Sequence, residues 1–146
     1  MFDDLKLNDA VIDLLDGIAA LGNSQTHAIY NALGQPKYRP IKSGVSRAAI
    51  VRHLNGERPI GGYFVLSDLT RVAVIDFDDH DGDMSWDDME AAALPIIREL
   101  HSRGLKTLCC RSGGGAGLHV WMFWEEPQSA KLVQQFIRAV IESCGF

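Results

Sequence analysis

The stretch Val72-Ala73-Val74-Ile75-Asp76-Phe77-Asp78 decides how the rest of the chain can fold. Its run of β-branched and apolar residues predicts a strand, and two aspartates stand one residue apart where that strand ends. Because the side chains of a strand alternate between its two faces, we expect Asp76 and Asp78 to project to the same side. The sequence therefore predicts a buried strand that carries a pair of carboxylates at its C-terminal end.

The flanking segments indicate the rest of the sheet and the helices that cover it. Apolar runs predict three further strands, and 3.6-residue spacing predicts two amphipathic helices. The strands are expected at 62–66, 107–110 and 118–124, and the helices are expected to begin at Ser85 and Ser129. The first of these helices has Asp88 three residues after Ser85, close to a capping box. The order β-β-α-β-β-α predicts an α+β fold with an RRM-like or ferredoxin-like sheet.

The N-terminal part of the chain has a different pattern. Residues 1–55 are predicted to form a helical, basic segment, with helices that begin at Asn8, His27 and Ser46. The His27 helix is expected to run to Leu33. Residues 35–44 contain two prolines and a glycine and predict a loop. We therefore expect a helical segment over 1–55 and an α+β core over 56–146.

The composition is that of an ordinary globular domain. Of the 146 residues, 47% are hydrophobic and 23% are charged, which excludes disordered and fibrous classes. No apolar run approaches the ~20 residues of a membrane span, and the acidic N-terminus lacks the pattern of a signal peptide. Three cysteines, two of them adjacent, form neither a disulfide framework nor a zinc-binding spacing. These features predict a cytoplasmic protein without a membrane partner.

The charges are unevenly distributed along the chain. Residues 36–58 contain six Lys and Arg against Glu57, a net charge of +5, whereas residues 76–90 contain eight acids and no Lys or Arg, a net charge of −8. One interpretation is an enzyme that holds a polyanion and a divalent metal. The other is two solvated faces of opposite sign.

The paired aspartates favour hard metal ions. Two carboxylates close together repel one another and raise each other's pKa unless a cation lies between them. Oxygen ligands of this type suit Mg²⁺ or Mn²⁺, and such ions serve phosphoryl or nucleotidyl transfer. The alternative is that the strand ends at Asp76 and that solvated aspartates begin the following loop.

The second candidate stretch is Arg111-Ser112-Gly113-Gly114-Gly115-Ala116-Gly117-Leu118-His119. It offers closely spaced backbone N–H groups, a hydroxyl and a guanidinium, all of which suit a phosphate. It is not a P-loop, because no Gly-Lys-Ser/Thr follows, and it is not a dinucleotide fingerprint, because a strand comes next. His119 either contacts a phosphate, binds a metal or is a core histidine. The nearby Trp121, Phe123 and Trp124 are interpreted as core or surface aromatics rather than base-stacking residues.

Together these segments resemble the archaeo-eukaryotic primase superfamily of primase-polymerases, and in particular the primase domain found in TOTE conflict systems. The resemblance covers roughly residues 50–140. The matching segments are His53–Gly56, Pro59–Leu66, Val74–Asp78, Arg111–Gly113, Gly117–Trp121 and Glu126–Ala130. Each segment alone is weak evidence for the family, but together the segments occur in the right order and at the right spacing.

The resemblance implies a role for each candidate residue. Asp76 and Asp78 correspond to the metal ligands of the first motif, which bind Mg²⁺ or Mn²⁺. His119 corresponds to the histidine of the second motif, which contacts the phosphates of the incoming nucleotide. Arg111, Ser112, Gly113 and Gly117 lie where the family's phosphate-binding loop is found. All three side chains Asp76, Asp78 and His119 are therefore expected to be catalytic.

The reaction implied is template-directed nucleotidyl transfer from ribo- or deoxynucleoside triphosphates by a DNA primase or polymerase. The implied partners are these nucleotides, a DNA template or primer, and a helicase or another replication or defence protein. A primase-like module that binds nucleotide or nucleic acid without catalysis is the alternative. A metal-dependent phosphohydrolase or nuclease would share the paired aspartates but would not need the Gly-x-His strand.

Three features depart from the family pattern. The glycine loop is about two residues longer than usual, and the upstream cysteine cluster of many relatives is absent. The family's third acidic ligand comes from a strand beyond the second motif, and Glu125 and Glu126 are poor substitutes because they directly follow the His119 strand. We therefore expect residues 56–146 to be the front part of a catalytic core that is incomplete at its C-terminus. Alternatively, the chain completes its site differently, or it no longer catalyses.

Overall fold

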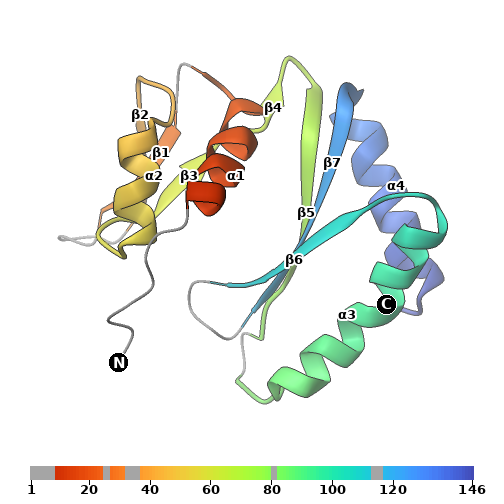
Figure 1. Cartoon of the computed structure of the whole chain (residues 1–146). Helices are drawn as coiled ribbons and strands as arrows, with labels where there is room; N and C mark the ends of the chain where they lie inside the picture. The colour runs from red at the N-terminus through yellow and green to blue at the C-terminus, as the bar shows by residue number, and fades with distance from the viewer. Residues whose placement is uncertain (1–8, 25–26, 32–36, 80–81, 113–116) are drawn as a thin grey trace. The chain divides into compact units, whose positions relative to one another are not determined.

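The computed structural model describes residues 9–24, 27–31, 37–79, 82–112 and 117–146 (Figure 1). Within these ranges the chain forms four helices and seven strands, and the strands form two antiparallel sheets. The expected α+β class is therefore confirmed as a combination of helices with antiparallel sheets. The chain divides into two compact units, Met1–Ser67 and Asp68–Phe146.

The first unit contains a three-stranded sheet and two helices. Its elements are α1 (Asp9–Ala20), β1 (His27–Asn31), β2 (Lys37–Ile41), α2 (Arg47–Leu54), β3 (Ile60–Gly62) and the two-residue β4 (Val65–Leu66). The sheet has the order β2-β1-β3, so that β1 is the central strand. His27 pairs with Ile41 on one side and with Gly62 on the other.

The N-terminal segment contains the helices α1 and α2 predicted after Asn8 and Ser46, but the prediction between them is wrong. The expected helix from His27 to Leu33 is instead strand β1, and the expected loop over 35–44 contains strand β2. Ala28 and Ile29 are both buried, which a central strand with partners on both sides achieves. A segment this short has no reliable periodicity, so pairing with distant residues decided its structure.

Helix α2 begins and ends where the sequence indicates. The Ser46 hydroxyl accepts a hydrogen bond from the backbone N–H of Ala49 at 3.2 Å, and Gly56 ends the helix with a φ of +75°. Arg47 at its start donates to Asp13 of α1 at 2.5 Å. This hydrogen bond raises the pKa of Arg47. The pair links α1 to α2.

The second unit contains the strand that carries the paired aspartates. Its elements are β5 (Leu69–Phe77), α3 (Trp86–Ser102), β6 (Thr107–Arg111), β7 (Leu118–Ser129) and α4 (Ala130–Ser143). Within this unit the strands pair in the order β5-β7-β6. Positive φ angles of 50° at Ser67 and 67° at Asp68 form the tight turn between β4 and β5.

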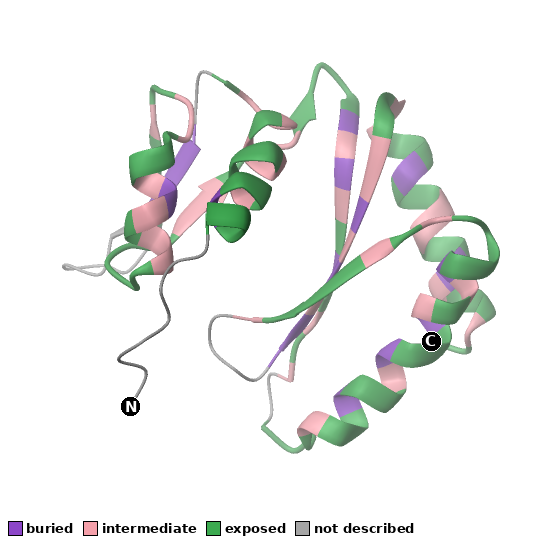
Figure 2. Ribbon diagram, viewed as in Figure 1, coloured by how far each residue is buried: buried purple, intermediate pink, exposed green. Residues whose placement is uncertain are grey.

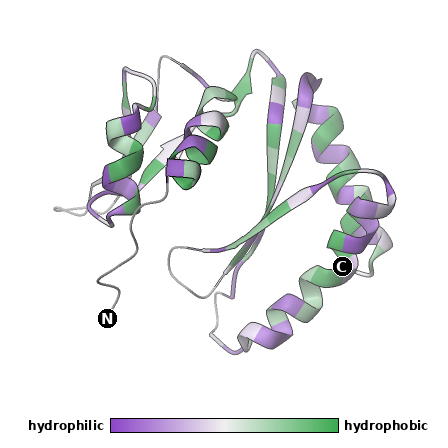
Figure 3. Ribbon diagram, in the orientation of Figure 1, coloured by the Kyte–Doolittle hydropathy of each residue, from purple (hydrophilic) through white to green (hydrophobic). Residues whose placement is uncertain are grey.

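Helices α3 and α4 cover one face of this sheet (Figure 1). The core is a set of fully or nearly buried side chains from both layers: Ile75, Met89, Ala93, Ile96, Leu100, Leu118, Val120, Met122 and Val140. Figure 2 shows buried residues along the central strands and on these helices, and Figure 3 shows hydrophobic and hydrophilic residues alternating around the helices. The helix-covered face therefore supplies the stability of this unit.

The start of α3 confirms the predicted capping box. The hydroxyl of Ser85 accepts from the backbone N–H of Asp88 at 3.2 Å, and the Asp88 carboxylate accepts from the backbone N–H of Ser85 at 3.3 Å. The buried residues Met89, Ala93, Ile96 and Leu100 follow helical spacing. In the described ranges, no helix combines the length and hydropathy that crossing a membrane requires.

Candidate functional site

The strongest candidate site lies where β5 and β7 pair. Asp76 is the register partner of His119, and the His119 Nε2 atom lies 3.3 Å from the Asp76 Oδ1 atom. The Asp76 side chain is 62% exposed and that of His119 is 30% exposed. The structure thus brings together two of the three side chains that the sequence predicts to act together.

Strand alternation explains why these polar groups are compatible with folding. Ile75 on β5 and both neighbours of His119 on β7, Leu118 and Val120, face the helices and are buried. Asp76 and His119 therefore project from the opposite face of the sheet. The site occupies the face that α3 and α4 leave uncovered.

Asp78 follows the last residue of β5 and is exposed to solvent. It lies two residues after Asp76, at the strand end where the sequence places a second carboxylate. Its backbone is no longer part of the sheet ladder, which ends with the pairing of Phe77 and Leu118. Asp78 is thus next to the site in sequence, and its role in metal binding stays a prediction.

Ser112 and Gly117 lie together beside this strand end. The backbone N–H of Ser112 donates to the Gly117 carbonyl at 2.7 Å, and the backbone N–H of Gly117 donates to the Ser112 hydroxyl at 2.9 Å. A Cβ atom at Gly117 would lie 2.9 Å from the carbonyl oxygen of Phe77. The glycine therefore allows close packing next to Asp78. Gly113 lies outside the described residues.

Arg111 has a different environment from the other candidates. It pairs with the buried Leu118, and its guanidinium carbon lies 4.3 Å from the centre of the Trp86 ring at the start of α3. This contact draws the guanidinium to the helix-covered side, whereas His119 and Asp76 project from the other side. The structure does not bring Arg111 to the pair, and its predicted contact with phosphate stays a prediction.

Aromatic side chains continue the open face beyond His119. The rings of His119 and Trp121 are 6.4 Å apart in an edge-on arrangement, and those of Trp121 and Phe123 are stacked at 6.3 Å. All three side chains are only partly buried. Trp121 and Phe123 are thus partly exposed aromatics, one of the two placements predicted for them, and Trp121 lies beside His119.

Two structural roles near the site have little or no signal in the sequence, and sequence reasoning missed them. The Asp79 carboxylate accepts from the backbone N–H groups of Gly82, Asp83 and Met84, at 2.9, 3.3 and 2.9 Å. It therefore shapes the segment that leads into α3. The sequence signal for the role of Asp79 was its position three residues before Gly82, a spacing that is common in turns. The contact between Trp86 and Arg111 joins residues 25 positions apart and leaves no local pattern.

Two described carboxylates stand one residue apart in sequence at this strand end, and they are the candidate ligands of a metal ion. Within the described ranges, no three or more His, Cys, Asp or Glu side chains are placed to hold one ion together. Asp76 and Asp78 are the carboxylates at this strand end. Mg²⁺ commonly takes one or two protein carboxylates together with substrate phosphates and water, so this donor set fits such an ion.

Comparison with known proteins identifies one family. The sequence model of the TOTE conflict system, Archaeo-Eukaryotic Primase domain matches residues 25–145, which is most of the chain. The match covers the strands that carry Asp76 and His119. No curated protein sequence matches the chain significantly.

Proposed function

Because the chain belongs to the archaeo-eukaryotic primase domain family of TOTE conflict systems, we propose that it catalyses metal-dependent, template-directed nucleotidyl transfer. The substrates proposed are ribo- or deoxynucleoside triphosphates and a DNA template or primer. The observation that carries the proposal is the contact between Asp76 and His119, which places an acid and an imidazole on adjacent strands of an open sheet face.

Each residue of the site has a role that its chemistry supports. Asp76 and Asp78 would hold Mg²⁺ or Mn²⁺, which when bound supplies positive charge to the triphosphate and to the attacking 3′-hydroxyl. His119 would donate a hydrogen bond from Nε2 to a phosphate oxygen as negative charge develops on the leaving pyrophosphate. In the structure the same nitrogen lies 3.3 Å from the Asp76 Oδ1 atom. Substrate binding would thus exchange one anionic partner of the imidazole for another.

Ser112 and Gly117 support the proposed phosphate site. The Ser112 hydroxyl accepts from the backbone N–H of Gly117 and keeps its own proton for donation to a phosphate oxygen. The order of elements from β4 to α4 supports an RRM-like sheet as the frame of this site. A helicase or another replication or defence protein is the proposed macromolecular partner beyond DNA.

The direct test is a primer-extension assay with the whole chain. We expect extension of a labelled primer on a template in the presence of dNTPs and Mn²⁺, and no extension in EDTA. Release of phosphate without a longer primer would instead identify a phosphohydrolase. If neither a longer primer nor free phosphate were formed under these conditions, the proposed catalysis would be contradicted.

A second candidate is a module that binds nucleotide without transferring it. It is favoured by the absence, among the described residues, of any group of three or more His, Cys, Asp or Glu side chains that could hold a metal ion. This candidate predicts metal-dependent binding of a fluorescent nucleoside triphosphate without extension of the primer. The two assays together separate the candidates.

His119→Ala is expected to weaken binding of a nucleoside triphosphate by about tenfold or more in Mn²⁺. The reason is the loss of a hydrogen bond to a charged phosphate, typically worth about 1.5–3 kcal/mol. Since the side chain is 30% exposed on the open face, the melting temperature should change little. Affinity is measured by isothermal titration calorimetry.

The matched control is His101→Ala. His101 is an exposed histidine of α3, whose Nε2 atom lies 2.9 Å from the Thr107 hydroxyl. This variant should bind nucleotide as the unchanged chain does. Equal affinity of the His119→Ala variant would show that the imidazole does not contact the nucleotide.

A further inference from the structure

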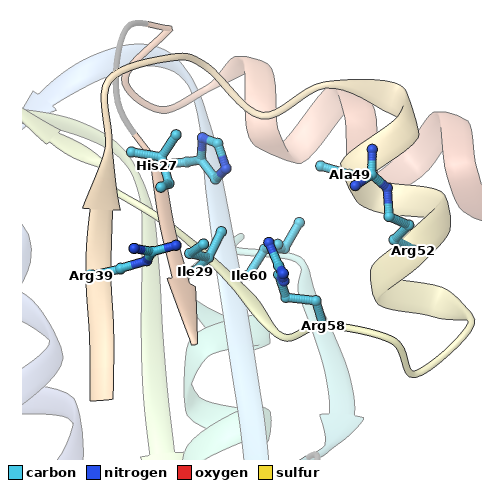
Figure 4. A pocket seen from close by; sticks show the side chains of 8 residues that line it. His27, Ile29, Arg39, Ala49, Arg52, Arg58 and Ile60 are labelled. Atoms are coloured by element: carbon cyan, nitrogen blue, oxygen red, sulfur yellow. The ribbon is translucent and has the colours of Figure 1, made fainter. Parts of the chain in front are cut away.

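A cavity lined by both apolar and basic side chains lies within the first unit, in a part of the chain to which the proposed reaction assigns no residue. It has a volume of about 280 Å³ and lies between the sheet β2-β1-β3 and helix α2 (Figure 4). Its eight described lining residues are His27, Ile29, Arg39, Ile41, Ala49, Arg52, Arg58 and Ile60. None of these eight is acidic.

Three arginines from three different segments surround this cavity. Arg39 comes from β2, Arg52 from α2 and Arg58 from the connection between α2 and β3, and Figure 4 shows their side chains around the same space. Within the described part of the chain, none of the three forms an ion pair, whereas Arg47 is engaged by Asp13 and Asp9. Like charges that line one cavity repel one another, so an anion bound between them would be stabilised.

Two buried residues of the central strand line the cavity beneath the arginines. Ile29 is 6% exposed and His27 is 6% exposed, and both belong to the central strand β1. The His27 Nδ1–H donates to the Ser43 carbonyl at 2.6 Å, which fixes the ring and leaves Nε2 as its second polar atom. A bound anion would therefore contact the guanidinium groups next to a histidine ring whose orientation is already fixed.

The dimensions of the cavity favour a small anion. Its volume lies just below the range of about 300–1,000 Å³ that is typical of sites for whole small molecules. Arginine is the side chain best suited to phosphate, because its planar guanidinium donates two parallel hydrogen bonds to phosphate oxygens. Positive charge, planar donors and limited space thus indicate a phosphate or diphosphate group rather than a complete nucleotide.

We propose that the cavity lined by Arg39, Arg52 and Arg58 is a phosphate-binding site in the first unit. The phosphate belongs either to a nucleoside triphosphate or to the backbone of a nucleic acid strand, since both present the same oxygens. This site goes beyond the proposed function, because it needs neither Asp76 and Asp78 nor a metal ion.

The proposal is tested by calorimetric titration of the whole chain with inorganic pyrophosphate in EDTA. EDTA removes divalent ions, so that binding does not report on the carboxylate pair. Pyrophosphate is expected to bind the unchanged chain, and Arg52→Gln and Arg58→Gln are each expected to weaken its affinity about tenfold or more. Both arginines are exposed, so circular dichroism and the melting temperature should be unchanged.

Lys42→Gln is the matched control. Lys42 is an exposed cation of the same unit that does not line the cavity, so its replacement removes the same charge elsewhere. We expect affinity within about twofold of the unchanged chain, as for a screened charge outside the site. An equal loss in Lys42→Gln would show that bulk charge alone attracts the anion and would overturn the proposal, as would the absence of pyrophosphate binding.

Two further titrations in EDTA identify the source of the phosphate. Tighter binding of dATP than of a single-stranded oligodeoxynucleotide supports a nucleotide site, and the reverse order supports a nucleic acid site. In both cases Arg52→Gln must weaken the preferred ligand. Unchanged affinity of all three ligands for the arginine variants would refute the site, whatever the result of the primer-extension assay.

Discussion

Replacing Asp76 with asparagine is expected to reduce nucleotidyl transfer by roughly 10²–10³-fold, the loss typical of removing one preorganised electrostatic contact to a transition state. The asparagine keeps the shape of the side chain but loses the negative charge that a divalent ion requires. Asp78→Asn should have an effect of the same order, because it removes the other carboxylate that is proposed to hold the ion. Initial rates of primer extension in Mn²⁺ measure both variants.

The fold should tolerate these changes. The Asp76 side chain is 62% exposed, and its contact with His119 at 3.3 Å is a partly solvated pair. Such pairs contribute about 0–1 kcal/mol, so the free energy of unfolding should change by less than about 1 kcal/mol.

Glu90→Gln serves as the control for lost charge. Glu90 is an exposed acid of α3 in the same acidic stretch, and its replacement changes the net charge by the same amount. This variant should extend primers at the unchanged rate. Full activity of both Asp76→Asn and Asp78→Asn would mean that the carboxylates are ordinary solvated groups at a strand end.

Gly117→Ala is expected to lower both stability and activity. The added methyl group would lie 2.9 Å from the Phe77 carbonyl oxygen and 2.9 Å from the Ser112 hydroxyl oxygen. Because one of these atoms is backbone, the strand end must move, at a cost of about 1–3 kcal/mol for overpacking. The Phe77 carbonyl belongs to the peptide that precedes Asp78, so the movement should displace that carboxylate. Denaturant unfolding and primer extension measure the two effects.

Gly17→Ala is the matched control for an added methyl group. Gly17 lies in α1, and a Cβ atom there would meet nothing within 4 Å. Alanine is the better helix former by about 1 kcal/mol, so this variant should be slightly more stable and equally active. If Gly117→Ala unfolded at the same denaturant concentration as the unchanged chain, the close approach at Gly117 would be refuted.

The elements predicted well from the sequence are those whose ends have local chemical signals. Ser46 and Ser85 accept the hydrogen bonds that begin α2 and α3, and such caps can be identified from a few neighbouring residues. Strand β1 carries no comparable signal. Its five residues gain their structure from pairing with β2 and β3, so the erroneous helix over His27–Leu33 reflects long-range contacts that short patterns do not contain.

The candidate site likewise combines features that can be predicted from the sequence with features that cannot. That Asp76 and His119 share one face of the sheet follows from strand alternation, whereas their direct pairing depends on the register of β5 and β7. The position of Arg111 over Trp86 does not follow, because it depends on where the start of α3 lies against β6. The arginine-lined cavity was also hidden, since Arg39, Arg52 and Arg58 meet only when three segments fold together. The excess of positive charge over residues 36–58 was the sequence feature that indicated this cavity.

The two faces of the β5-β7-β6 sheet are subject to different constraints. One face holds the residues that keep the unit folded, and the other presents Asp76 and His119 to the surroundings. Substitutions at these two positions should therefore yield intact protein at normal cellular levels. In a mutational scan, an abundance screen would miss them and an activity screen would find them. A descendant of this chain could thus lose the proposed catalysis and persist as a folded competitor for the proposed ligands.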